Sequence, residues 1–160
     1  EGRYLGHTGG VTMFDRFNAH WAVLRDEGVI TSEEYLHATF AQHYRTVEEF
    51  TAPFKDKNSA VSKAGLQLRS FYTRLTPCPF RVAYDNATED MTPAEFAASL
   101  VPTMRSWSET VFRTALEGRP ETEITAIVDR FYDAYEAEIA GSPDGHAMDY
   151  IHIILEIEKA

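Results

Sequence analysis

The sequence predicts a mostly α-helical fold with a minor β component. Several segments repeat apolar residues every three or four positions, which is the period of an amphipathic helix. Only two segments, residues 66–76 and 149–158, alternate their side chains with the period of a β-strand. At 160 residues, of which 44% are hydrophobic, the chain is long enough to bury a core of its own.

The composition excludes several classes of function. Twenty-five acidic against fifteen basic side chains give a net charge of −10, which repels nucleic acid and anionic lipid surfaces. No apolar run is long enough to span a membrane, and no segment has the pattern of a secretory signal. The single cysteine, Cys78, cannot form an intrachain disulfide, so we expect a reducing compartment, the cytoplasm. The chain opens with Glu1 in a Gly-rich stretch that is typical of a loop, and we expect it to be a portion of a longer protein.

The first helix is predicted from residue 12 to Gly28, which is suited to a left-handed helix cap. A short helix follows, with Thr31 or Ser32 as its N-cap, and the segment HATFAQHY at 37–44 is ambiguous. The apolar residues of the first helix are spaced by three and four positions and are Met13, Phe14, Phe17, Trp21 and Leu24.

The middle of the chain combines short helices with a strand. Thr46 and Glu49 form a capping pattern, and we expect Pro53 to end that helix quickly. A further short helix closes at Gly65, and the strand at 66–76 stops at the prolines of TPCP. Regular alternation in this strand places on one face Leu66, Leu68, Ser70, Tyr72 and Arg74, opposite Gln67, Arg69, Phe71, Thr73 and Leu75.

Two longer helices are predicted in the second half. Thr92 as N-cap, Pro93 at the first helical position and Glu95 at the third mark a helix start. We expect Pro102 to break or restart this helix, which then runs to Gly118. The last helix, at 120–141, carries an apolar stripe of Ile124, Ile127, Val128, Phe131 and Tyr135.

Neither predicted strand has a hairpin partner next to it in the sequence. A two-stranded sheet is marginal by itself, and an unpaired strand edge must be covered in a folded protein. We therefore interpret the pattern as an α/β sheet from which most strands are missing.

No residues form a recognisable catalytic or metal site. Glu34 and His37 have the Glu-x-x-His spacing of di-iron bundles, but those bundles need two such motifs, so a solvated helix face is favoured. Cys78 lies between prolines, as in a rigid turn, and the acidic stripe of the last helix is typical of a solvated surface. The chain contains no P-loop and no Gly-x-Gly-x-x-Gly motif, so we expect nothing in it to bind a phosphate or dinucleotide. We expect no cofactor-binding residues, no metal ligands and no catalytic residues.

Aromatic and thioether side chains are the remaining candidates for a site. Taken separately, each is typical of a hydrophobic core, but together they could wall an apolar pocket with Tyr44 as a polar tip. They are Met13, Phe14, Phe40, Tyr44, Met104, Trp107 and Tyr150.

The order of motifs resembles the C-terminal half of the SABATH-type carboxyl methyltransferases. The motifs are LRDEGVIT, FAQHYRTVEEF, a strand, LVPTMRSWSETVF, DRFYDAYE and a final strand DYIHIILEIEK. They are similar in order to the family's SEGLI helix end, F-x-I-P-x-Y segment, C-M-R-A helix and F-I-N-V strand. The resemblance covers essentially the whole chain, although each motif is loose.

This resemblance implies the C-terminal portion of a Rossmann-like class I methyltransferase with a helical cap. The cap would comprise residues 11–64 and 92–140, and residues 66–76 and 149–158 would be the two terminal strands of its sheet. The parent enzyme would transfer a methyl group from S-adenosylmethionine to a small carboxylic acid. The cofactor site, and the glutamine and tryptophan that grip the carboxylate, would precede Glu1, so we expect the chain alone to be inactive and to bind no cofactor.

The resemblance also assigns the substrate-binding residues. They are Met13, Phe14, Tyr44, Met104, Trp107 and Tyr150. Trp107 stands where the family has a smaller residue, and Phe14 where a tryptophan is common, so the identity of the acceptor stays open. The expected partners are the small carboxylic acid and further copies of the chain, with no nucleic acid and no membrane. The alternative is a stand-alone helical domain that binds an apolar ligand or dimerises without catalysis.

Overall fold

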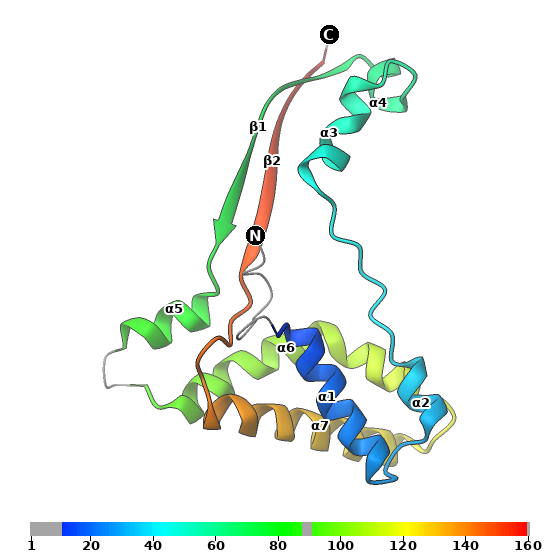
Figure 1. Ribbon diagram of the computed structural model, residues 1–160, viewed down its shortest axis with the longest axis vertical. Helices are drawn as coiled ribbons and strands as arrows, with labels where there is room; N and C mark the ends of the chain where they lie inside the picture. The colour runs from blue at the N-terminus through cyan, green and yellow to red at the C-terminus, as the bar shows by residue number, and fades with distance from the viewer. Residues whose placement is uncertain (1–10, 88–90, 160) are drawn as a thin grey trace. The chain divides into compact units, whose positions relative to one another are not determined.

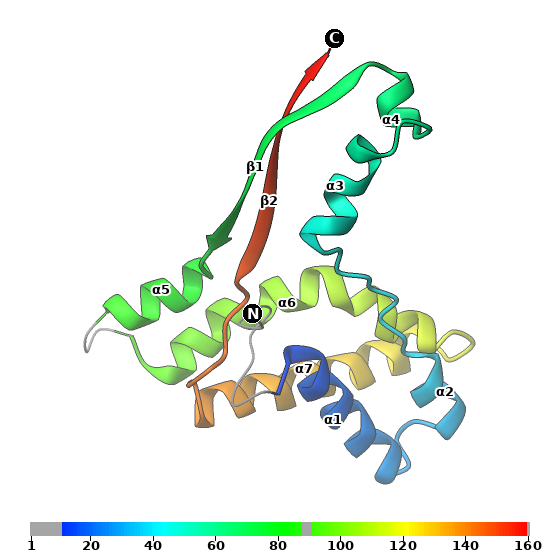
Figure 2. The ribbon, with the colours of Figure 1, turned by 45° about the horizontal axis from the view of Figure 1, so that its top comes forward.

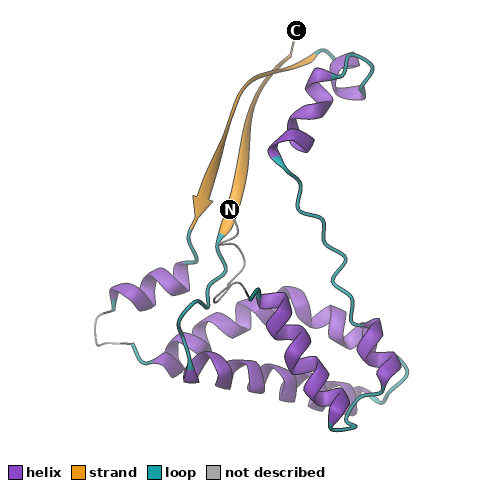
Figure 3. Ribbon diagram, viewed as in Figure 1, coloured by secondary structure: helices purple, strands orange, loops and turns teal. Residues whose placement is uncertain are grey.

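The computed structural model describes residues 11–87 and 91–159 and is mostly helical, with a small antiparallel sheet (Figure 3). The predicted combination of many helices and few strands is therefore confirmed. The predicted loop at residues 1–10 lies outside the described residues. The elements are α1 (Met13–Asp26), α2 (Ser32–His37), α3 (Val47–Lys55), α4 (Ala60–Lys63), β1 (Leu66–Thr76), α5 (Pro79–Asn86), α6 (Pro93–Ala115), α7 (Glu121–Gly141) and β2 (Tyr150–Lys159).

The chain divides into two compact units. The helical unit comprises residues 1–40 and 77–149, and the ribbon unit comprises residues 41–76 and 150–160. The chain therefore passes between the units after residues 40, 76 and 149. The helices at 47–63 belong to the same unit as the strands, whereas the sequence analysis grouped them with the cap. None of the described helices is long and apolar enough to cross a lipid bilayer.

The core of the helical unit is formed by α1, α6 and α7, which pack against one another (Figures 1 and 2). Phe17 of α1 is buried at its centre, and its ring lies within 6.4 Å of the rings of Phe112, Phe131 and Tyr132. The predicted stripe of α7 is buried as expected. Stacked and edge-to-face rings of this kind each add about 0.5–1.5 kcal/mol beyond the apolar area that they bury.

Local signals position most of the helix ends. Thr31, Thr46 and Thr92 each form a capping box with the glutamate three residues later, and Thr12 forms one with Asp15. Each box satisfies backbone N–H groups that have no partner inside the helix. At the other ends, Gly28 and Gly65 have φ of 72° and 76°, the left-handed conformation that the sequence predicted at Gly28.

The predictions for two prolines are wrong. α3 continues through Pro53 to Lys55, and α6 continues through Pro102 without interruption. A proline inside a helix loses one hydrogen bond and costs about 3 kcal/mol. In α6 the flanking residues Leu100, Val101 and Met104 are buried, and each such burial contributes about 1.5–3 kcal/mol, which outweighs that cost.

α5 was missed by the sequence analysis, which interpreted PCP only as a turn. Cys78 is the N-cap residue and Pro79 occupies the first turn, where its missing N–H is not needed. Tyr84 stacks on Phe96 of α6 with 4.7 Å between ring centroids, and Arg81 pairs with Asp85 one turn later. These contacts hold a short helix that has little propensity of its own.

In the ribbon unit β1 and β2 form an antiparallel pair from Leu66↔Lys159 to Thr76↔Tyr150. α3 and α4 both contact β1. The regular alternation predicted for β1 is wrong, because the register shifts between Leu68 and Ser70. This bulge brings the two apolar halves of β1 onto one face. That face carries Leu66, Leu68, Phe71, Thr73, Leu75, Ile151, Ile153, Leu155, Ile157 and Lys159.

Candidate functional site

Three aromatic rings gather at the edge of the core of the helical unit. We call them the aromatic triad. They are Phe14 of α1, Phe40 of the segment after α2, and Trp107 of α6. Their ring centroids lie 5.3 Å apart for Phe14 and Phe40, 6.2 Å for Phe14 and Trp107, and 6.1 Å for Phe40 and Trp107. All three are partly exposed while packing against the buried core. The triad is therefore one part of the border of the core that is open to a ligand.

The triad has an apolar surface and contains one polar side-chain atom. That atom, the indole Nε1 of Trp107, is buried and has no hydrogen-bond partner. An unsatisfied buried donor costs about 1–3 kcal/mol. The other side-chain atoms of the triad are hydrocarbon, so the surface can bind and shield an apolar group but cannot transfer a proton.

The two methionines predicted to line the pocket lie in the core. Met13 is 0% exposed and Met104 is 1% exposed, and both belong to the hydrophobic cluster of the helical unit. Each is a close neighbour in sequence of a triad residue: Met13 precedes Phe14, and Met104 lies one turn before Trp107. A role for them in contacting substrate stays a prediction.

The other two predicted residues, Tyr44 and Tyr150, belong to the ribbon unit. Tyr44 is 62% exposed, and its hydroxyl donates to Gln42 Oε1 at 2.5 Å. Partial burial, and secondly the neighbouring Tyr150, raise the pKa of the Tyr44 phenol. Tyr150 is 44% exposed and stacks on His152 with 5.9 Å between ring centroids. The two phenols thus lie near each other, while a single pocket formed by all six residues stays a prediction.

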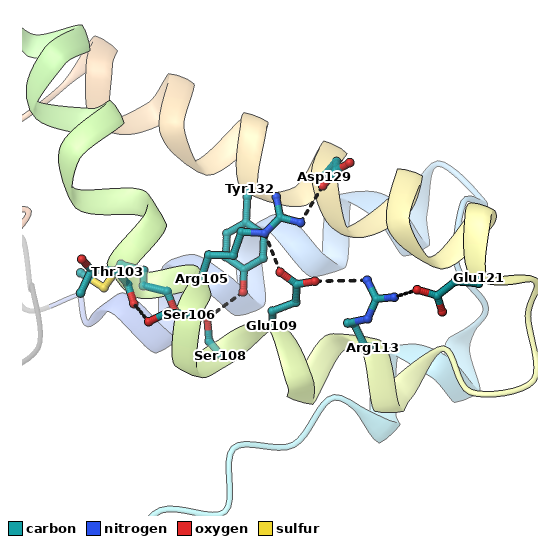
Figure 4. Close-up of polar contacts among 10 residues, drawn as sticks. Thr103, Arg105, Ser106, Ser108, Glu109, Arg113, Glu121, Asp129 and Tyr132 are labelled. Atoms are coloured by element: carbon teal, nitrogen blue, oxygen red, sulfur yellow. Dashed lines mark hydrogen bonds and ion pairs between the residues drawn. The ribbon is translucent and has the colours of Figure 1, made fainter.

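A polar network fixes α6 beside α7 on the turn that carries Trp107 (Figure 4). The hydroxyl of Ser108 donates to the carbonyl of Met104 at 2.6 Å and lies 2.7 Å from the hydroxyl of Tyr132. Arg105 donates to Glu109 and to Asp129, at 2.6 and 2.7 Å. Because Ser108 and Tyr132 are both buried, their hydrogen bond joins α6 to α7 inside the core, one residue after Trp107.

Residues with other chemistry are engaged elsewhere. Glu34, of the Glu-x-x-His motif, forms a bidentate ion pair with Arg119, at 2.5 and 2.7 Å. This pairing lowers the pKa of Glu34 to about 2. Cys78 is a buried, free thiol. Within residues 11–87 and 91–159, no group of three His, Cys, Asp or Glu side chains could hold a metal ion.

Sequence reasoning identified Phe14 and Trp107, and it considered Phe40 without assigning it to the site. Phe40 lies in the segment that was ambiguous, since residues 38–46 form no regular element. The only available signal was its aromatic character. Comparison of the sequence with protein-family models and with curated proteins finds no match.

Proposed function

We propose that this chain is the acceptor-binding cap, with the last two strands, of an S-adenosylmethionine-dependent O-methyltransferase that acts on a small carboxylic acid. The observation that carries the proposal is the division of the chain into a helical unit, with a partly exposed aromatic triad, and a separate β-ribbon unit. The order of motifs in the sequence supports the same assignment. In this proposal the helical unit shields the acceptor and the ribbon belongs to the sheet of the cofactor domain.

The ribbon has the features of an incomplete sheet. Within residues 11–87 and 91–159, each strand pairs only with the other, so each leaves one edge without a strand beside it. Phe71, Leu75, Ile151 and Ile157 of the apolar face are exposed. An edge of this length with exposed apolar side chains is an aggregation site unless further structure covers it.

The two edges differ in their ability to accept another strand. β1 contains the bulge near Arg69 and is followed by Pro77, and both features disfavour continued pairing. β2 pairs without a bulge over the ten residues Tyr150–Lys159 and contains no proline. The outer edge of β2 is thus the better candidate for the place where a larger sheet continues.

The chemistry of the triad suits methyl transfer to a carboxylate. A carboxylate is already ionised at neutral pH, so the reaction needs no general base, and catalysis consists mainly of positioning and exclusion of water. The triad would supply both through Phe14, Phe40 and Trp107. The electrophilic methyl group would come from the cofactor bound by the parent enzyme.

The alternative is a stand-alone helical domain that binds an apolar ligand or dimerises. The exposed apolar face of the ribbon favours it, because a second copy could cover that face. The two proposals differ in what the chain alone should do. The alternative expects a stable dimer or a ligand complex in the absence of any cofactor domain.

The first test uses the chain alone. Isothermal calorimetry with S-adenosylhomocysteine should show no binding heat, and tight binding would mean that the cofactor site has been misplaced. Analytical ultracentrifugation of the same sample tests the alternative. If the chain is a stand-alone dimerisation domain, it should form a concentration-dependent dimer, and the charged substitution Ile157→Lys should dissociate that dimer.

The second test uses the chain joined to the region encoded directly upstream of Glu1. This protein should transfer labelled methyl groups to one or more members of a panel of small carboxylic acids. Trp107→Ala should change kcat/KM for the acceptor at least tenfold and leave cofactor affinity unaltered. Val82→Ala, at an exposed position of α5, is the matched control. An upstream region that binds no cofactor would contradict the proposal.

A further inference from the structure

One carboxylate in the helical unit is faced by three basic side chains. Glu138 of α7 accepts from Arg16 Nη1 at 2.8 Å and lies 2.5 Å from His20 Nε2. The third base is His146, whose Nε2 lies 3.9 Å from the same carboxylate. Arg16 and His20 come from α1, whereas His146 lies in the segment that follows α7.

His146 is the most deeply buried of these groups. It is 3% exposed, and its ring packs edge-on against Tyr135 with 5.9 Å between centroids. Burial lowers the pKa of His146; Glu138 opposes this effect, whereas Arg16, Arg81 and His20 add to it. The imidazole is thus held in its neutral form by an apolar neighbour and by cations from two helices.

The charged and titratable groups around His146 come from every element that packs on it. α1 contributes Arg16 and His20, α5 contributes Arg81, and α7 contributes Tyr135 and Glu138. In its own segment, Asp144 lies 3.9 Å from Arg81 and is almost fully exposed. A proton added to His146 would therefore meet one nearby carboxylate and at least two permanent positive charges.

The segment that holds His146, residues 142–149, is fastened at both of its ends. Arg81 Nη1 donates to the carbonyl of Pro143 at 2.8 Å, and the His146 N–H donates to the same carbonyl at 3.3 Å. At the other end, the Cys78 N–H donates to Asp149 Oδ1 at 2.7 Å. Cys78 follows β1 and Asp149 precedes β2, so this last bond joins the two stretches that lead out of and into the ribbon.

We propose that His146 is a pH-sensitive latch, whose protonation releases residues 142–149 from the helical unit. The inference does not depend on the proposed function. It concerns one of the three places where the chain passes between its units. Release would detach the residues that lead into β2 from α5 and α7.

The direction of the effect follows from linkage. His146 binds a proton less readily in the closed segment than in the open one, where the pKa of a histidine is about 6.5. The closed segment is therefore fully favoured above that value and loses stability as the pH falls through it. Between pH 7.5 and 5.5 the opening equilibrium should rise, by no more than about tenfold, which is the limit for a closed form that takes up no proton over this range. Carboxyl groups in general titrate below this range.

Native-state hydrogen exchange of the full chain tests the latch. The backbone amide of Cys78, which donates to Asp149, reports on the C-terminal end of the segment, and that of His146 reports on the turn inside it. After correction for intrinsic exchange rates, their opening constants should rise from pH 7.5 to 5.5, by up to about tenfold, while those of amides in the middle of α6 stay unchanged. Equal constants at the two pH values would overturn the proposal.

Three variants identify the titrating group. His146→Gln should remove the pH dependence, and His37→Gln, at an exposed position of α2, should leave it intact. Loss of the dependence in His20→Gln alone would overturn the assignment to His146. Because His146→Gln could disturb folding, the imidazole of the unaltered protein is also followed by NMR: it should titrate below the ordinary value for histidine. Titration at or above that value, with the amides still protected, would refute the latch.

Discussion

The ion pair between Glu34 and Arg119 should contribute measurably to the stability of the helical unit. The pair is bidentate and joins α2 to the turn after α6, and only 17% of the Glu34 side chain is exposed. The hydrogen bond from Arg119 is the main cause that lowers the pKa of Glu34 from 4.5 to about 2. That shift corresponds to about 3 kcal/mol at 1.4 kcal/mol per unit, and solvent screening reduces it to about 1–2 kcal/mol.

We therefore expect Glu34→Gln to lower the free energy of unfolding by about 1–2 kcal/mol at pH 7. Urea unfolding followed by tryptophan fluorescence measures it, since Trp21 and Trp107 both lie in the helical unit. The pKa of Glu34 is lowered in the folded state, so its contribution is complete above pH 4.5 and is lost as the pH falls toward 2. The difference between the two proteins should shrink over that interval.

The matched control is Glu33→Gln. Glu33 lies in the same first turn of α2, so it interacts equally with the helix dipole, but its side chain is exposed. It should lose no more than about 0.5 kcal/mol. The reasoning fails if both variants lose the same stability, or if the effect of Glu34→Gln is independent of pH.

Two further predictions concern the core. Phe17→Ala should destabilise the helical unit by about 3–5 kcal/mol in the same assay, since the buried ring contacts both α6 and α7. Val23→Ala, on the exposed side of α1, should cost below about 0.5 kcal/mol. A loss below about 1.5 kcal/mol for Phe17→Ala would show that the core is not packed around this ring. Ser108→Ala should cost about 1–3 kcal/mol by leaving the Tyr132 hydroxyl unsatisfied, and adding Tyr132→Phe should recover part of that loss. Simple additivity of the two substitutions in a double-mutant cycle would contradict the coupling.

Helix starts could be predicted because the interactions that define them are local. In each capping box, the threonine and the glutamate lie three residues apart, so both partners are visible in the sequence. The same holds for Gly28, whose positive φ suits glycine at the end of a helix. No knowledge of the rest of the fold is needed at these positions.

The wrong predictions lie at positions whose local structure depends on residues that are distant in the sequence. Pro102 remains helical because residues on both of its sides are buried against other elements, and that burial is not visible locally. α5 depends on the stacking of Tyr84 on Phe96, twelve residues away. Within the candidate site, Met13 and Phe14 are adjacent in sequence, yet one is core and the other is partly exposed. Periodicity locates the apolar side of a helix, but the packing partners decide which residues at its border stay accessible.

The ribbon illustrates the same principle in a strand. Leu68 and Phe71 are three positions apart, so regular alternation would place them on opposite faces. The register shift between Leu68 and Ser70 brings both to the same face, where Leu68 pairs with Ile157 and Phe71 with Leu155 of β2. A bulge leaves one residue of the strand without a partner, here between Leu68 and Ser70. In return, the apolar side chains of β1 stay on one face along the whole strand, which a strictly alternating pattern could not achieve.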